Sequence, residues 1–184
     1  MSRKTLIVNG SPRVNGNTVS LLNELKKHLQ GEIIEVSAYR SKIAPCVDCR
    51  GCWTTARCVV RDDMEVFYGD DFDNVVLASP VYFADLPGQV MNLISRMQPW
   101  HAATYFLKQP LVQRPKKAGL ILTAGSKGNA MSATRHARTL FMLLNAKGYE
   151  DHLVVSGNTD TIPADQDEKA LADARKLAEW LNED

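Results

Sequence analysis

Val75-Val76-Leu77-Ala78-Ser79-Pro80 is the stretch that decides the fold class of this chain. Its first four residues form an unbroken apolar run, which is typical of a central strand buried on both faces of a parallel sheet. The run stops at Ser79-Pro80, a turn signal. A strand of this kind needs helices on both faces of its sheet, so strands and helices should alternate along the chain.

The rest of the chain shows this alternation. Short apolar strands are predicted at residues 6–8, 32–36, 75–78, 118–122 and 153–155. Helical spacing of apolar residues is found at 22–29, 90–97, 137–144 and 171–181. Asn17 or Thr18 is expected to cap the first helix, and Asp62-Asp63 to open another. Residues 98–117 contain three prolines and are predicted to form a long connection with one short helical piece. Five alternations indicate one α/β domain with a parallel sheet covered on both faces.

The composition excludes several classes of partner. Of the 184 residues, 45% are apolar and 23% are charged, as in ordinary globular proteins, and the formal net charge is +1. This charge favours neither nucleic acid nor an anionic membrane as a partner. The apolar run Leu6-Ile7-Val8 is too short for the core of a signal peptide, and no run approaches the length of a membrane span. The expected location is the cytoplasm, where thiols stay reduced.

All four cysteines of the chain lie within thirteen residues, as Cys46, Cys49, Cys52 and Cys58. The spacing C-x2-C-x2-C-x5-C lets a short loop direct four sulfurs at one centre, as in cubane iron–sulfur sites. The same spacing is compatible with zinc or with redox-active thiols. Trp53 either shields a cluster from water or contacts another subunit. The flanking Arg50, Arg57 and Arg61 either offset the charge of a cluster or form a solvated surface.

Three loops follow predicted strands, at the sheet edge where open doubly wound sheets bind ligands. The loop at 10–18 has the composition of a phosphate cradle, with two glycines, the hydroxyls of Ser11 and Thr18, and Arg13, or else it is a polar turn with a helix cap. It fits neither the G-x-x-x-x-G-K-[ST] nor the G-x-G-x-x-G pattern. Loop 79–83 offers Tyr82 and Phe83 to a flat ring, or to ordinary packing. Loop 123–129 has two glycines, which allow close backbone approach or form a simple turn.

These motifs resemble one known family. Gly10-Ser-Pro-Arg13 with Asn17-Thr18, the four cysteines, Asp62-Asp63-Met64 and Ser79-Pro-Val-Tyr82 look like the NADPH-dependent FMN reductase family of flavodoxin-like proteins. The cysteine spacing is similar to that of its iron–sulfur flavoprotein subgroup. The resemblance runs from about Lys4 to Leu144.

The resemblance implies a flavodoxin-like three-layer sandwich with a five-stranded parallel sheet in the order 2-1-3-4-5, and bound FMN. Matching positions assign the FMN phosphate to Ser11, Arg13, Asn17 and Thr18, and the isoalloxazine ring to Pro80, Val81, Tyr82 and Phe83. The turn that contains Thr123 and Gly125 would close the other side of the ring. The loop at 44–61, with Cys46, Cys49, Cys52 and Cys58, would ligate a [4Fe–4S] cluster near the flavin. Family members are typically homodimers or homotetramers.

The function implied is that of an FMN-dependent NAD(P)H oxidoreductase. Electrons would pass from a nicotinamide through FMN to a quinone-like, flavin or protein acceptor, directly or through the cluster. The alternatives are a non-enzymatic electron carrier, a structural zinc loop and a redox-sensing thiol loop. The chemistry needs no acid–base pair, and His28, His101, His136 and His152 are expected to be surface or packing residues.

Overall fold

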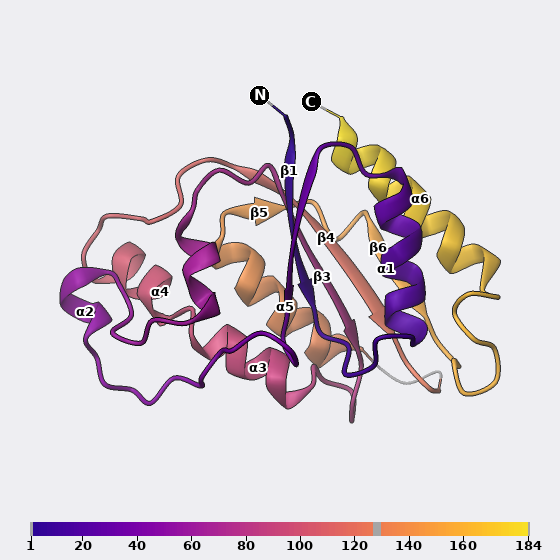
Figure 1. The fold of residues 1–184 in the computed structure, drawn as a ribbon, viewed down its shortest axis with the longest axis horizontal. Helices are drawn as coiled ribbons and strands as arrows, with labels where there is room; N and C mark the ends of the chain where they lie inside the picture. The colour runs from indigo at the N-terminus through magenta and orange to yellow at the C-terminus, as the bar shows by residue number, and fades with distance from the viewer. Residues whose placement is uncertain (1, 127–129, 184) are drawn as a thin grey trace.

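The computed structural model describes residues 2–126 and 130–183, which form a parallel sheet between two layers of helices (Figure 1). The strands are β1 (Lys4–Asn9), β2 (Glu32–Ser37), β3 (Asn74–Pro80), β4 (Lys116–Thr123), β5 (Ala146–Lys147) and β6 (Leu153–Ser156). Their order is β2-β1-β3-β4-β5, and β6 also pairs with β4. The predicted order 2-1-3-4-5 is confirmed.

One edge of the sheet is built differently from the prediction. The short strand β5 pairs with the start of β4, at Lys116 and Lys117, whereas β6 pairs with its end, from Leu120 to Thr123. The predicted fifth strand is β6. Strand β5 has only two residues, too few to show a periodic pattern in the sequence.

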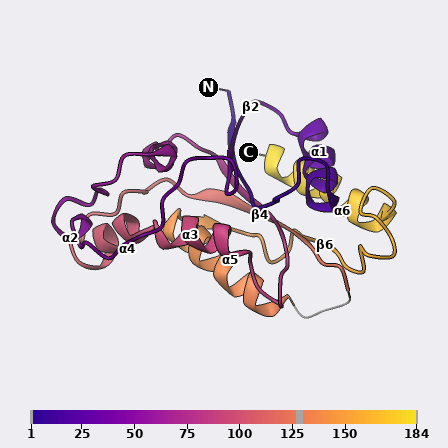
Figure 2. The ribbon, with the colours of Figure 1, turned by 60° about the horizontal axis from the view of Figure 1, so that its bottom comes forward.

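The helices cover both faces of the sheet (Figure 2). Their bounds are α1 (Asn17–His28), α2 (Cys52–Thr55), the 3₁₀ helix η1 (Asp63–Tyr68), α3 (Gly88–Ser95), α4 (Gln98–Tyr105), α5 (Met131–Leu143) and α6 (Glu168–Asn182). On one face, α1 and α6 share a buried cluster with alternate strand residues that include Ile7 and Val76. On the other, α3, α4, α5 and η1 pack with the intervening residues, such as Leu6 and Val75. This alternation follows from the two-residue period of a strand.

The connection before β4 contains one short helix, as predicted. Helix α4 begins at Gln98 and has Pro99 in its first turn, where the missing N–H of proline costs no hydrogen bond. Helix α2 lies against α4, where the Trp53 and Phe106 rings meet edge to face at 4.9 Å. Together these two short helices form the end of the molecule that lies on the left in Figure 1.

Of the two predicted helix openings, the one at Asp62-Asp63 is confirmed and the predicted cap of the first helix is wrong. The residue that caps α1 is Gly16, and Asn17 instead accepts a hydrogen bond from the backbone of Ala164. Asp62 caps η1 by accepting from the N–H of Met64, so Asp62-Asp63 does open a helix. Among the described residues, no helix combines the length and apolar character needed to cross a bilayer.

Candidate functional site

A cleft of ≈ 240 Å³ lies at the carboxyl ends of β1, β3 and β4. The structure brings most of the residues predicted for cofactor binding together around it. Those that line it are Ser11, Arg13, Asn17, Thr18, Pro80, Val81, Tyr82, Thr123 and Gly125. The Phe83 side chain is fully exposed and is not among the lining residues. The lining is completed by Pro12 and Gly16, which lie within the predicted loop at 10–18, and by Thr159 and Asp160, which were not predicted.

The end of the cleft formed by the β1–α1 loop is suited to an anion. Gly16 caps α1 in an extended conformation and has no side chain to occupy the free amides of the first turn. Ser11 is buried, its N–H donates to Asn9 Oδ1 at 2.9 Å, and its hydroxyl is bonded to the carbonyl of Arg13. Free helix amides, a hydroxyl and the Arg13 guanidinium therefore face the same volume.

Two long-range hydrogen bonds fix this end to the rest of the fold. The Thr18 and Thr123 hydroxyls are 2.7 Å apart and both residues are buried. Asn17 Oδ1 accepts from the N–H of Ala164 at 3.0 Å. The start of α1 is thereby joined to the end of β4 and to the segment after β6.

A strained turn carries the aromatic wall of the cleft. Tyr82 and Asp85 exchange two backbone hydrogen bonds, of 2.8 and 2.9 Å, so residues 82–85 form a two-residue hairpin. Phe83 and Ala84 have φ of 51° and 67°, the left-handed values of a type I′ turn, which usually contains asparagine and glycine. The Tyr82 side chain is partly exposed beside the cleft, and Phe83 stands at the tip of the turn.

His136 on α5 holds this turn through Asp85. Its Nδ1 lies 2.8 Å from Asp85 Oδ1, which also accepts from the N–H of Leu86 at 2.7 Å. Burial alone would raise the pKa of Asp85, but the hydrogen bonds with His136 and Leu86 outweigh it and keep that pKa below its ordinary value. His136 thus has a more specific role than a surface or packing position. Its 51-residue separation from Asp85 hid the pair from sequence reasoning.

The third wall of the cleft is closed by the segment after β6. Thr159 donates from its backbone to Ala124 at 2.9 Å, and the N–H of Asp160 donates to the carbonyl of Gly125 at 3.2 Å. A Cβ atom at Gly125 would lie 2.8 Å from Asp160 Cγ, so any larger residue here would displace the Asp160 side chain. Residues 127–129 of the predicted loop lie outside the described residues.

The four cysteines surround a second, much smaller cavity of ≈ 20 Å³. Cys46 and Cys49 are exposed and Cys52 is buried. Asp48, Arg50 and Ala56 have φ of 50°, 60° and 53°, and these left-handed residues bend the loop tightly around the cavity.

Four thiol groups line this cavity. Burial raises the pKa of Cys52, and the three other thiols raise it further. Within residues 2–126 and 130–183, no group of three or more potential ligands converges closely enough for a single ion. A cubane suits a wider arrangement, because each cysteine binds a different iron.

Arg96, at the end of α3, closes the cysteine loop. Its guanidinium donates to the carbonyls of Ala44 and Val60 at 2.7 and 3.3 Å, and to both carboxylate oxygens of Asp62 at 2.6 and 3.1 Å. It therefore holds both ends of the segment that carries the cysteines. Arg96 is 2% exposed and lines the cysteine cavity. Sequence reasoning missed it, because a single arginine at the end of an apolar helix carries no pattern.

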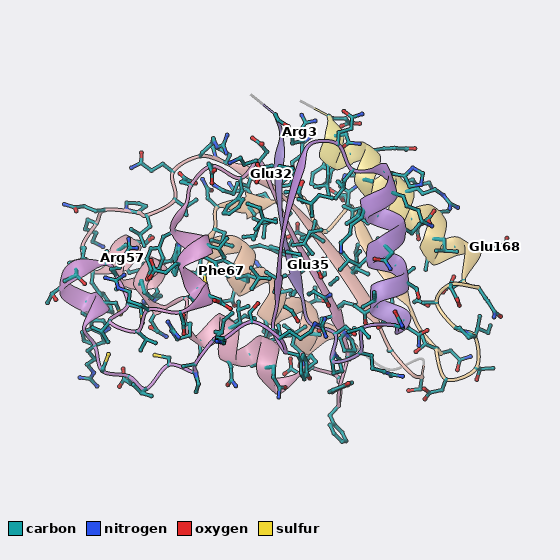
Figure 3. The ribbon with its side chains drawn as sticks, in the orientation of Figure 1. Arg3, Glu32, Glu35, Arg57, Phe67 and Glu168 are labelled. Carbon is teal, nitrogen blue, oxygen red and sulfur yellow. The ribbon has the colours of Figure 1, made fainter. Side chains whose placement is uncertain are left out.

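The arginines within the cysteine loop are surface residues. Arg57, labelled beside α2 in Figure 3, lies over the Tyr68 ring and pairs with Glu65. Arg61 also pairs with Glu65, and Arg50 lies over the Trp53 ring. For Arg57 and Arg61 the structure favours the solvated surface, whereas Arg50 is exposed but also lines the cysteine cavity. The cysteine cavity and the large cleft share no lining residue.

The fold and the cleft define a flavodoxin-like protein. The sequence profile of the NADPH-dependent FMN reductase family matches residues 3–160, and the chain belongs to this family. It is accordingly an NAD(P)H-dependent flavin oxidoreductase.

The curated relatives include iron–sulfur flavoproteins. One from Methanocaldococcus jannaschii is 27% identical over 162 residues, which cover 85% of this chain and 77% of the relative. One from Archaeoglobus fulgidus is 27% identical over 98% of this chain and 94% of its own length. An FMN-dependent NADH-azoreductase of Bacillus anthracis, solved in complex with FMN, superposes with a TM-score of 0.67 at 13% identity, covering 98% of this chain and 100% of the other. The azoreductase comparison supports the fold.

Proposed function

We propose that the cleft at the carboxyl ends of β1, β3 and β4 binds FMN. The observation that carries this proposal is the open N-terminus of α1, where free amides, the Ser11 hydroxyl and Arg13 face one volume at the carboxyl edge of the sheet. In a family of FMN reductases, a dianionic phosphate is the ligand that this end suits.

The remaining lining residues suit the other parts of FMN. Pro80, Val81 and Tyr82 offer an apolar and aromatic wall to a flat ring. Thr123 and Gly125 close the opposite side, and the Asp160 carboxylate can accept hydrogen bonds from the ribityl hydroxyls. Thr18 already bonds to Thr123, so it supports the wall of the phosphate site. The exposed Phe83 lies outside this lining and is a candidate contact for a second molecule.

The reaction proposed is electron transfer from NAD(P)H to a quinone-like, flavin or protein acceptor. Bound FMN supplies the two-electron chemistry of that exchange. Residues of the chain would hold the phosphate and support the ring, and the nicotinamide and the acceptor would reach it from the open side of the cleft. The His136–Asp85 hydrogen bond keeps the turn that carries Tyr82 in place.

We further propose that Cys46, Cys49, Cys52 and Cys58 hold a [4Fe–4S] cluster. Their common cavity and the iron–sulfur flavoproteins among the relatives support this. The small enclosed volume implies that the exposed thiols Cys46 and Cys49 move outward to admit it. The cluster would supply one-electron transfer. A homodimer or homotetramer and a cytoplasmic location are part of the same proposal.

An anaerobic absorption spectrum of the purified protein tests the flavin, and a titration of the apoprotein measures its affinity. Arg13→Gln should weaken FMN binding by about 10- to 100-fold, because it removes a charge-assisted hydrogen bond to phosphate. Arg138→Gln, which removes an exposed arginine lining a different cavity, should bind FMN like the wild type. A colourless protein that takes up no FMN would refute the proposal.

Two further measurements separate the alternatives. A protein that binds FMN but oxidises neither NADH nor NADPH with quinones, ferricyanide or oxygen, yet cycles with a redox partner, would be an electron carrier. Iron and acid-labile sulfide should be found in equal amounts after anaerobic reconstitution. Zinc without iron or sulfide would show that the cysteines form a structural zinc site. A disulfide formed within the loop on mild oxidation would show that they act as a redox sensor.

A further inference from the structure

One buried hydrogen-bond donor points to a role that neither the fold nor the family assigns. Among the described residues, two buried side-chain atoms lack a hydrogen-bond partner, Arg96 Nε and Trp100 Nε1. Of these two residues, Arg96 lines the cysteine cavity. A buried N–H without a partner is unfavourable, so such a group commonly faces an acceptor that binds separately.

The geometry of Arg96 fixes where this N–H points. A guanidinium has five N–H groups, and the two terminal nitrogens of Arg96 use theirs on Ala44, Val60 and both oxygens of Asp62. Four bonds to a planar group leave it no freedom to rotate. The fifth N–H, on Nε, is thereby held in one direction.

Arg96 and Cys58 line the same small cavity, so the Cys58 sulfur is the candidate acceptor on this side. The Arg96 guanidinium also donates to the carbonyl of Val60, two residues after Cys58, at 3.3 Å, which places it beside this part of the loop. The backbone N–H of Cys58 donates to the Tyr68 hydroxyl at 2.9 Å, which fixes the backbone of this residue.

We propose that Arg96 is a positioning residue for the cysteine-bound cluster, with its Nε–H donating a hydrogen bond to the Cys58 sulfur. This inference rests on the proposed [4Fe–4S] cluster. Hydrogen bonds to ligand sulfurs set the reduction potential of a cluster, and a buried cation offsets its negative charge. The same guanidinium holds both ends of the loop, so one residue couples loop closure to the electronic state of the cluster.

Arg96→Lys and Arg96→Gln test this role, with Arg61→Lys and Arg61→Gln as matched controls. Arg61 lies on the same loop but is exposed and pairs only with Glu65 among the residues whose contacts are described. The Arg96 variants should lose iron to a chelator about 10- to 100-fold faster than wild type. Their clusters should also have a lower reduction potential, measured by EPR-monitored titration. The Arg61 pair should match wild type in both measurements.

FMN content serves as the folding control, because the cleft shares no lining residue with the cysteine cavity. Arg96 variants that retain FMN, iron-loss rate and potential at wild-type values would overturn the proposal. If these variants fail to fold, wild-type protein labelled with ¹⁵N at arginine Nε decides instead. Pulsed EPR of the reduced cluster should then show ¹⁵N coupling that persists in Arg61→Gln, and its absence would refute the hydrogen bond.

Failure of the underlying function gives a different result. Wild-type protein that takes up neither iron nor sulfide would refute the cluster itself, and the role of Arg96 with it. If the wild type binds iron and sulfide but the Arg96 variants match it in iron-loss rate and reduction potential, only the role of Arg96 is refuted.

Discussion

Replacing Asp62 by asparagine should destabilise this protein far more than its partly exposed position suggests. Asp62 accepts two hydrogen bonds from Arg96, one from the N–H of Ala44 and one from the N–H of Met64. Asparagine keeps the shape but removes the charge, and its amide group would face the guanidinium. Arg96 would then be a buried cation without its counter-ion.

The magnitude follows from the burial of the pair. The side chain of Arg96 is 1% exposed and that of Asp62 is 11% exposed. Breaking a pair at this depth by removing one partner costs about 3–5 kcal/mol. Glu65 pairs with Arg57 and Arg61 on the surface, where its side chain is 37% exposed. Glu65→Gln should therefore destabilise the protein much less, because exposed ion pairs contribute little.

Urea unfolding of the full chain, followed by far-UV circular dichroism, measures both variants in the same state of cofactor loading. The pH dependence gives a second check. Burial alone would raise the pKa of Asp62, but Arg96 and the two amides hold it below its ordinary value. A carboxylate whose pKa is lower in the folded than in the unfolded protein stabilises the fold at pH values above its unfolded-state pKa. This stabilisation is lost as the pH falls through the folded-state pKa.

The difference in the free energy of unfolding between wild type and Asp62→Asn should therefore be largest at neutral pH and should shrink below about pH 4. A cost for Asp62→Asn no larger than that of Glu65→Gln would refute the reasoning. It would mean that water reaches the Arg96 guanidinium.

Three further predictions concern other parts of the fold. Hydrogen bonds from Lys27 and Arg175 lower the pKa of Glu24 to about 2. Glu24→Gln should therefore lower the free energy of unfolding at pH 7 but not near pH 2, and equal losses at both pH values would contradict this. Gly125→Val should lower FMN affinity by about tenfold or more in an equilibrium titration, because its side chain displaces Asp160, and unchanged affinity would argue against this wall. Ala84→Gly should stabilise the protein by about 0.5–1 kcal/mol in urea unfolding, whereas a destabilisation would show that its left-handed conformation carries no strain.

Much of the fold was predictable because burial leaves a periodic trace in the sequence. The run at Val75–Ala78 is buried on both sides, within β3 as predicted. Alternate residues of β1 pack into the two core clusters on opposite faces of the sheet, as the layered fold requires. The short strand β5 and the four-residue helix α2 escaped prediction, because elements of this length depend on tertiary contacts rather than on their own pattern.

The candidate site was predictable only where its residues follow strands directly. Ser11, Tyr82 and Thr123 are placed by the topology of a parallel sheet, since the carboxyl ends of its strands share one edge. Asp160 reaches the cleft through a backbone hydrogen bond to Gly125 that no local motif signals. The left-handed Phe83 could not be foreseen either, because type I′ turns are recognised by asparagine and glycine, which this turn lacks.

The hydrogen bonds of Asn17 and Thr18 have a consequence for the order in which the protein is made. The first helix emerges early from the ribosome, but its partners Thr123 and Ala164 lie 105 and 147 residues further along the chain. Contacts so distant in sequence form late. The growing polypeptide therefore has no complete cofactor cleft until the segment beyond β6 has been translated. The proposed FMN site therefore forms only when the chain is nearly complete.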